Sequence, residues 1–425
     1  MADHDFRNVI VDGKRDKYAR LLIWAGFLVY MLMLGSKNVY SAELVTLMEV
    51  FDTTKAQTSL AMTYYFIVYA ICQIVLSFIM SKLNLRIFLS LSGGLSALSV
   101  ILIGLSKSIN SIYYICALNG VFSAGIYAGC MATFSKYVPA KMLPFANKMM
   151  TLGSAFYAVL CYGVPPIFVD RGLWNMPFIV LGSLFLLSVV FFFVVFTKLK
   201  DYPTEIQVKT VDKEKPLLNL ASKKIKFIYF AICIITAVVN GGMYYCVFSY
   251  IPNLFKEAFS MPDSYSILIT LVVPLIASMF SVYVISLSYK FTNMFKVAFL
   301  VMFVGMLALL LVVFVFDYNI ILTLALFVVF VACRTGTNSV FTGVLAFKMR
   351  NQINSGSFLA IINAIAAIMA GVVPTIIGSV IDSYSGLTGY GVSYLIALVN
   401  CFIFMLIILG FIFWFNKSSK LQNEL

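Results

Sequence analysis

DYPTEIQVKTVDKEKPLLNLASKK, residues 201–224, is the one long charged stretch inside this sequence, and it divides the chain in two. It lacks apolar periodicity, so we expect a solvated linker. Six apolar runs lie on each side of it, and most exceed 18 residues, enough for a helix to cross about 30 Å of hydrocarbon. The runs are 19–46, 58–81, 87–106, 111–137, 147–169 and 173–197 before the linker, and 226–255, 264–289, 295–316, 319–347, 354–380 and 388–416 after it.

These runs predict an all-α membrane protein with twelve transmembrane helices in two six-helix halves. Its segments would be a cytoplasmic N-terminal tail, a first bundle, a cytoplasmic linker, a second bundle and a cytoplasmic C-terminal tail, at 1–18, 19–198, 199–225, 226–416 and 417–425. A weak repeat favours pseudo-symmetry. GVPPIFVD (163–170) ends the fifth run and GVVPTIIGSVID (371–382) ends the eleventh. Duplicated halves with a site between them are common among transporters.

Composition excludes several classes of protein. The chain is 62% hydrophobic and 11% charged, whereas soluble domains carry about 25% charged residues. The ten-residue alternation of a membrane β-barrel is absent. The net charge of +13 is scattered over short loops, which disfavours a nucleic-acid partner. The only histidine is His4, and the eight cysteines stand singly, so we predict neither an enzyme nor a metal or cofactor site.

Lysine and arginine placement predicts the orientation in the membrane. With the N-terminus in the cytoplasm, 24 of the 30 basic residues fall in cytoplasmic segments and four in outer loops. An excess of basic residues marks cytoplasmic loops. We therefore expect both termini in the cytoplasm, in an inner or plasma membrane, with no cleavable signal peptide. The two remaining cations, Lys37 and Arg334, fall inside apolar runs.

Six plus six helices with a basic central loop resemble the major facilitator superfamily. Within it, SKNVYSAEL (36–44) and YIPNLFKEAFSM (250–261) resemble segments of the organophosphate:phosphate antiporters and anion:cation symporters. Ser36, Tyr244 and Gln73 stand where those antiporters carry basic residues. The resemblance implies a rocker-switch mechanism, with a central cavity lined by the first, fourth, seventh and tenth helices.

Two buried cations are the strongest functional signal. Arg334 lies near the middle of its run, in VVFVACRTGTNSVFTGVL (328–345). A charge there costs at least ~2.5–3.5 kcal/mol and usually marks a site. It could instead be a structural arginine bonded to backbone carbonyls. Lys37 could extend toward the interface rather than bind substrate. If both cations face the cavity, as the resemblance implies, an anion could bridge the two halves.

Further polar residues at helical spacing are candidates for the same cavity. We expect substrate contacts from six of them, with helix–helix hydrogen bonds as the alternative. They are Gln73, Asn119, Tyr127, Asn240, Tyr244 and Asn338. Glu43 is the one candidate for coupling to a proton, because the later spans hold no acidic residue in their interior. It could also be a solvated residue at the outer end.

The sequence thus favours a secondary active or facilitative transporter of a small organic anion, either a carboxylate or a phosphorylated metabolite, working as a monomer in the bilayer. A multidrug or lipophilic-solute exporter is the first alternative, suited by the 39 Phe and 24 Tyr. A membrane sensor that has lost transport is the second.

Overall fold

The computed structural model describes residues 3–200, 223–291, 293–341 and 355–417, and in these ranges the chain is helical without strands. Much of the predicted linker lies outside them. Twelve of the described helices, some built from two consecutive segments, are long and apolar enough to span a membrane. They fall on the twelve predicted runs with small shifts at their ends, so the predicted all-α membrane fold is confirmed.

The first half contains α1 to α9. Its helices are α1 (Asp3–Ala42), α2 (Leu44–Phe51), α3 (Lys55–Ile79), η1 (Met80–Lys82), α4 (Leu85–Gly104), α5 (Ile109–Ser123), α6 (Ile126–Tyr137), η2 (Ala140–Met142), α7 (Leu143–Gly163), α8 (Pro166–Val169) and α9 (Met176–Lys200). Spans four and five are each made of two segments, α5–α6 and α7–α8.

The second half contains α10 to α18. Its helices are α10 (Lys223–Phe248), α11 (Ile251–Phe259), α12 (Asp263–Thr270), α13 (Val272–Lys290), α14 (Met294–Val315), α15 (Ile320–Ser339), α17 (Ser355–Asp382) and α18 (Thr388–Lys417). Spans seven and eight are again double, α10–α11 and α12–α13.

Local sequence explains where the helices begin. Thr54 and Gln57 form a capping box at α3, in which each side chain accepts a hydrogen bond from the other residue's backbone N–H. Asn319 caps α15 by accepting from the Leu322 N–H at 3.1 Å. Because lipid offers no hydrogen bonds, the backbone within the spans must pair internally, which an uninterrupted helix achieves.

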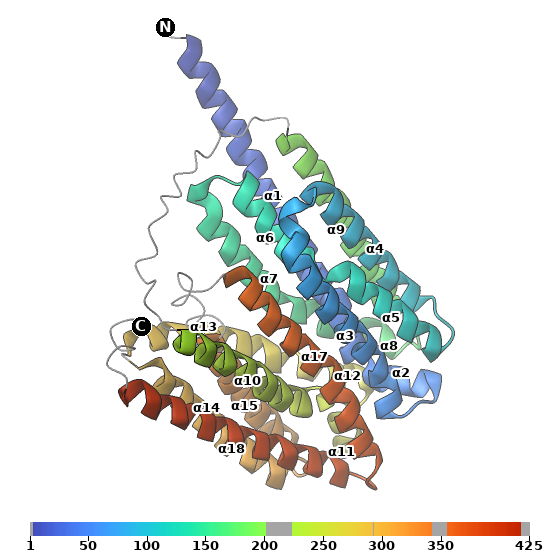
Figure 1. Cartoon of the computed structure of the whole chain (residues 1–425). Helices are drawn as coiled ribbons and strands as arrows, with labels where there is room; N and C mark the ends of the chain where they lie inside the picture. The colour runs from blue at the N-terminus through green and yellow to red at the C-terminus, as the bar shows by residue number, and fades with distance from the viewer. Residues whose placement is uncertain (1–2, 201–222, 292, 342–354, 418–425) are drawn as a thin grey trace.

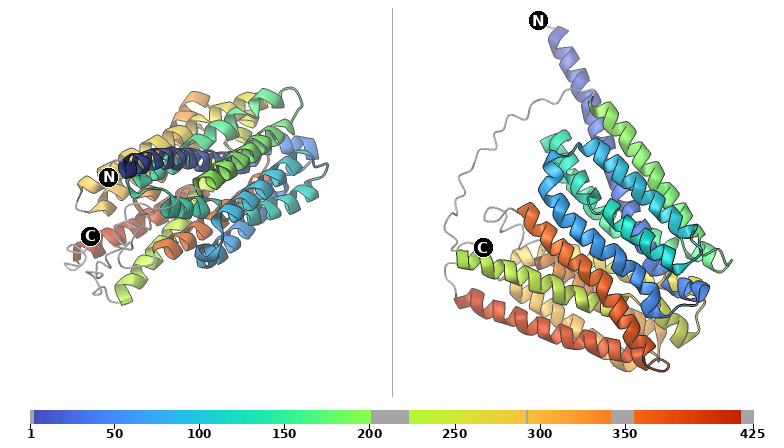
Figure 2. Two further views of the ribbon diagram at one scale, coloured as in Figure 1. Left: turned by 90° about the horizontal axis from the view of Figure 1, so that it is seen from above. Right: turned by 45° about the vertical axis from the view of Figure 1, so that its right-hand side comes forward.

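The two halves meet at one end and diverge toward the end where α1 begins and α18 ends (Figures 1 and 2). We call these the closed end and the wide end. The main contact is α17 packed along α3, and α13 lies against α7. Gly371 permits the first approach, because a Cβ there would stand 2.9 Å from Phe66 Cβ and 3.1 Å from Thr63 Cα.

Polar contacts fasten the halves together at the closed end. Lys55 of α3 pairs with Glu257 of α11 at 2.8 Å, and Lys256 pairs with Glu49 of α2. The side chain of Asp382 accepts from the Ala56 N–H at 3.0 Å. Further bonds join Thr63 to the Gly371 carbonyl at 2.7 Å, Tyr250 to the Lys55 carbonyl at 3.3 Å and Ser264 to Asp170 at 2.6 Å. The structure therefore shows a conformation sealed at this end.

Candidate functional site

Two cavities lie between the halves. The larger has a volume of about 550 Å³, and its walls come from α1, α3, α6, α7, α10, α15 and α17. The smaller, of about 50 Å³, lies closer to the closed end. Residues 30–37 of α1 line the larger cavity, whereas Asn38 and Ser41 line the smaller one. Along α1, the large cavity therefore lies nearer the wide end and the small cavity lies nearer the closed end.

Lys37 lines the large cavity. Its ammonium nitrogen lies over three aromatic rings, 4.9 Å from the centroid of Phe66, 5.4 Å from Tyr69 and 5.7 Å from Tyr65. Within the described part of the chain it forms no ion pair, and no Asp or Glu lines either cavity. Aromatic faces stabilise a cation without neutralising it. Lys37 is thus a cation of the cavity wall that aromatic rings hold in place.

Arg334 is held by α10. Its Nε and Nη2 both donate to the Asn240 carbonyl, at 3.1 and 3.0 Å. Its guanidinium also lies 4.6 Å from the ring centroid of Tyr244. Arg334 does not line either cavity itself, but Tyr244 lines the small one and Asn338, one turn after Arg334, lines the large one. The arginine therefore sits just behind the cavity wall, with part of its donor set used structurally.

The other predicted residues divide into three groups. Gln73, Tyr127 and Asn338 line the large cavity. Asn240 lies behind the wall and donates from Nδ2 to Asn338 Oδ1 at 3.4 Å. Asn119 is placed differently from the prediction. It is buried between α5 and α4, where its Oδ1 accepts from Ser96 Oγ at 2.6 Å, so it makes a helix–helix hydrogen bond.

For Glu43, the structure contradicts the alternative of a solvated outer residue. It stands between α1 and α2, is 0% exposed, and neither carboxyl oxygen has a well-formed hydrogen bond. The hydroxyl of Thr46 lies beside the carboxyl group, and its oxygen is also buried without a well-formed hydrogen bond. The sequence left the burial of Glu43 open because α11 and α12, which lie at the closed end, are distant from it in sequence.

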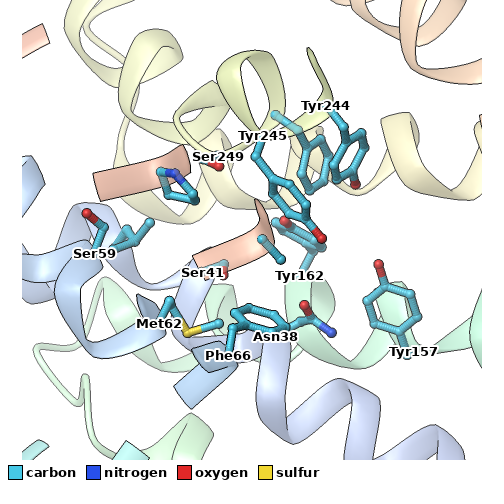
Figure 3. Close-up of a pocket in the computed structure, with 14 residues that line it drawn as sticks. Asn38, Ser41, Ser59, Met62, Phe66, Tyr157, Tyr162, Tyr244, Tyr245 and Ser249 are labelled. Carbon is cyan, nitrogen blue, oxygen red and sulfur yellow. The ribbon is translucent and has the colours of Figure 1, made fainter. Parts of the chain in front are cut away.

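The structure adds wall residues that the sequence analysis did not single out. They are mainly tyrosines and amides, namely Tyr30, Tyr69, Tyr157, Tyr162, Tyr245, Asn38 and Asn363. In the small cavity, Tyr157, Tyr162 and Tyr245 gather around Asn38 (Figure 3). Tyrosines inside apolar runs were the available signal, but helix rotation decides which of them face the cavity.

Known proteins share this architecture. A bacterial homolog of the human lysosomal transporter Spinster, solved in an inward-facing, unoccupied conformation, superposes with a TM-score of 0.74 at 15% identity, covering 93% of this chain and 96% of its own. A D-xylose–proton symporter gives 0.71 at 15% identity, with 92% and 97% covered. The nucleoside transporter NupG gives 0.64 at 14%, with 92% and 98% covered.

At these identities the likeness concerns the fold. A search of curated proteins finds no match. A family model described as "Major Facilitator Superfamily" matches residues 26–374, which is most of the chain and includes parts of both halves. That match agrees with the two six-helix bundles around a central cavity, and with a transporter rather than an enzyme. The chain belongs to the Major Facilitator Superfamily.

Proposed function

We propose that this protein is a secondary transporter that carries a small organic anion by alternating access. The observation that supports it best is Lys37, a cation in the wall of the 550 Å³ cavity, which no Asp or Glu lines among the residues that the structure describes. A charge kept in the membrane core without a counter-ion is costly, which is why such residues usually serve a site. An anionic solute would supply the missing charge.

Arg334 would strengthen the attraction from the second half. Two of its N–H groups already donate hydrogen bonds to the Asn240 carbonyl, and its guanidinium lies over the ring of Tyr244. These contacts fix the guanidinium, so that little side-chain entropy is lost when it acts on a solute. The proposed roles are therefore unequal: Lys37 contacts the anion, whereas Arg334 supplies a positive field and orients Tyr244.

Amide and phenol groups would bind the remainder of the solute. Gln73, Tyr127 and Asn338 line the large cavity and offer both donors and acceptors. Such a lining suits a carboxylate that also carries hydroxyl or amide groups. Phosphorylated metabolites remain within the proposed substrate class.

The test is uptake and binding by purified protein. Reconstituted vesicles should take up a labelled organic acid found by thermal-shift screening, in which a ligand at 100 times its Kd raises stability by about 2.7 kcal/mol. Lys37→Gln should remove saturable uptake and Arg334→Gln should weaken it strongly, while Lys107→Gln, which changes an exposed loop cation, should leave it intact. Normal uptake by Lys37→Gln would overturn the proposal.

A polar uncharged solute is the second candidate. The tyrosines and amides of the cavity favour it, and two of the similar structures are named as a nucleoside transporter and a xylose symporter. The same screen separates the two candidates. Stabilisation by nucleosides or sugars that is unaffected by Lys37→Gln would support the second.

Orientation follows from the basic loops. We propose that the wide end faces the cytoplasm, because the predicted cytoplasmic segments hold most of the lysines and arginines. The conformation described here would then be open toward the cytoplasm.

We further propose Glu43 as the coupling residue. A buried carboxylate without hydrogen bonds or a paired cation is strongly disfavoured, so this side chain holds a proton while the closed end is sealed. Opening that end would admit water and allow ionisation. Protonation is thereby linked to the conformational change. The charged residues on the helix segments around it are Glu49, Lys55, Lys256, Glu257 and Asp263, and Asp263 disfavours a negative charge at Glu43.

A further inference from the structure

A separate basic cavity lies on the first half, outside the central ones. It has a volume of about 340 Å³ and opens where η1, α4, α6 and α9 meet. We call it the basic pocket. Its lining residues are Lys82, Leu83, Asn84, Leu85, Arg86, Lys136, Tyr137 and Phe196. Three cations from three helical elements thus surround one cavity, and no Asp or Glu of the described ranges lines it.

Two of these cations lie close to aromatic rings. The guanidinium of Arg86 lies 6.0 Å from the ring centroid of Phe193, and the Lys136 ammonium lies 5.4 Å from that of Tyr137. Tyr137 in turn packs edge-on against the buried Phe196 at 4.8 Å. None of the three cations forms an ion pair within the residues that the structure describes. The pocket therefore gathers positive charge that no carboxylate balances there.

The N-terminus of α4 adds to the positive electrostatic potential of the basic pocket. Asn84 takes the N-cap position, but its side chain makes no capping hydrogen bond. The first backbone N–H groups of any helix lack intrahelical acceptors, and the helix dipole makes that end positive. Residues 84–86 lie in the pocket wall, so these features reinforce the three side-chain charges.

Another cavity of the same half provides an internal comparison. Its lining, at the start of the first span, includes Arg20, Trp24 and Lys141, but it also includes Asp16. Lys141 pairs with that carboxylate at 2.6 Å. The general excess of cations at cytoplasmic ends explains why basic residues occur in both places. It does not explain why the basic pocket collects them around a cavity that no carboxylate lines in the part of the chain that the structure describes.

We propose that the basic pocket binds a phosphate-bearing anion. Arginine and lysine around a concave wall, together with free helix-terminal N–H groups, are groups that bind phosphate. The chemistry fits two sources: the headgroup of an anionic phospholipid reaching the pocket from the bilayer, or a soluble phosphate compound. This site is distinct from the transport cavity, and the inference does not depend on which solute is carried.

The experiment uses the full-length protein in lipid nanodiscs. One arm compares phosphatidylcholine discs with discs that contain phosphatidylglycerol, and counts retained phosphatidylglycerol by native mass spectrometry. The other arm adds inorganic phosphate to phosphatidylcholine discs at constant ionic strength and follows thermal unfolding. The variants are the triple change Lys82→Gln, Arg86→Gln and Lys136→Gln, and the charge-retaining double change Lys82→Arg and Lys136→Arg. Lys141→Gln is the matched control.

Affinity should fall roughly fivefold for each cation removed. The charge-retaining variant and Lys141→Gln should bind as the native protein does, which separates loss of charge from misfolding. Charge-dependent retention of phosphatidylglycerol assigns the lipid as source, and charge-dependent stabilisation by phosphate alone assigns the soluble anion. The proposal is wrong if the triple variant binds both probes as tightly as the native protein, or if Lys141→Gln loses binding to the same extent.

Discussion

Replacing Gly378 with alanine should open the closed end. This glycine of α17 faces α3, and an added Cβ would stand 2.8 Å from the Ala56 nitrogen and 2.9 Å from the Lys55 carbonyl carbon. Heavy-atom contacts of this kind normally measure about 3.5–4.0 Å, so α17 and α3 must separate by roughly 1 Å. The atom nearest to the added Cβ would be the hydroxyl oxygen of Tyr250, which belongs to the same half and can shift, whereas the clash with α3 arises only while the halves are closed.

The size of the effect follows from the bonds that such a separation breaks. The hydrogen bond from Ala56 N–H to the Asp382 side chain measures 3.0 Å, and that from the Tyr250 hydroxyl to the Lys55 carbonyl measures 3.3 Å. A bond to a charged group contributes about 1.5–3 kcal/mol and a neutral one about 1 kcal/mol. The closed end should therefore lose about 2.5–4 kcal/mol, which shifts the ratio of closed to open molecules by roughly 60- to 700-fold.

Distance measurements between spin labels provide the assay. Labels at Arg171→Cys and Tyr318→Cys, both in exposed loops, would report the separation of the halves at that end, after replacement of the eight native cysteines. Gly378→Ala should move most of the distribution to longer values. Gly94→Ala is the matched control, since a Cβ there meets nothing within 4 Å. An unchanged distribution for Gly378→Ala, or an equal change for Gly94→Ala, would refute the argument.

Three further predictions concern single contacts. Lys55→Glu and Glu257→Lys should each weaken the closed end by about 1 kcal/mol, because the ion pair is only partly shielded from water. The double variant, which exchanges the two charges, should restore it. A double-mutant cycle on the same label distances measures this. Raising the pH on the side of the closed end should favour ionisation of Glu43 and thereby the form in which that end is open. Glu43→Gln should remove this pH dependence and favour closure. A pH series that is identical in both proteins would contradict the protonation proposal. Tyr244→Phe should preserve solute affinity because the ring over Arg334 remains, whereas Tyr244→Ala should weaken solute binding by about 1–2 kcal/mol. Calorimetry measures both affinities, and equal losses in the two variants would show that the hydroxyl matters instead.

The sequence by itself determined the number and approximate ends of the spans and the division into two halves. Each span is a local property, because about twenty apolar residues must form a helix in lipid whatever their neighbours are. It also singled out Lys37 and Arg334, since a charge inside an apolar run is visible without knowing the fold. The expected span ends shifted by a few residues, where caps such as Thr54 and Asn319 set the first turn.

Only the tertiary structure decided what those residues face. Helix rotation turns Asn119 toward Ser96 and away from the cavity, although its spacing matched that of Tyr127. Helices remote in sequence bury Glu43, and the Asn240 carbonyl of α10 accepts hydrogen bonds from Arg334. Contacts between distant segments depend on how whole helices pack, which no local pattern encodes. The sequence therefore placed the charges in the membrane, and packing decided which of them an incoming solute can reach.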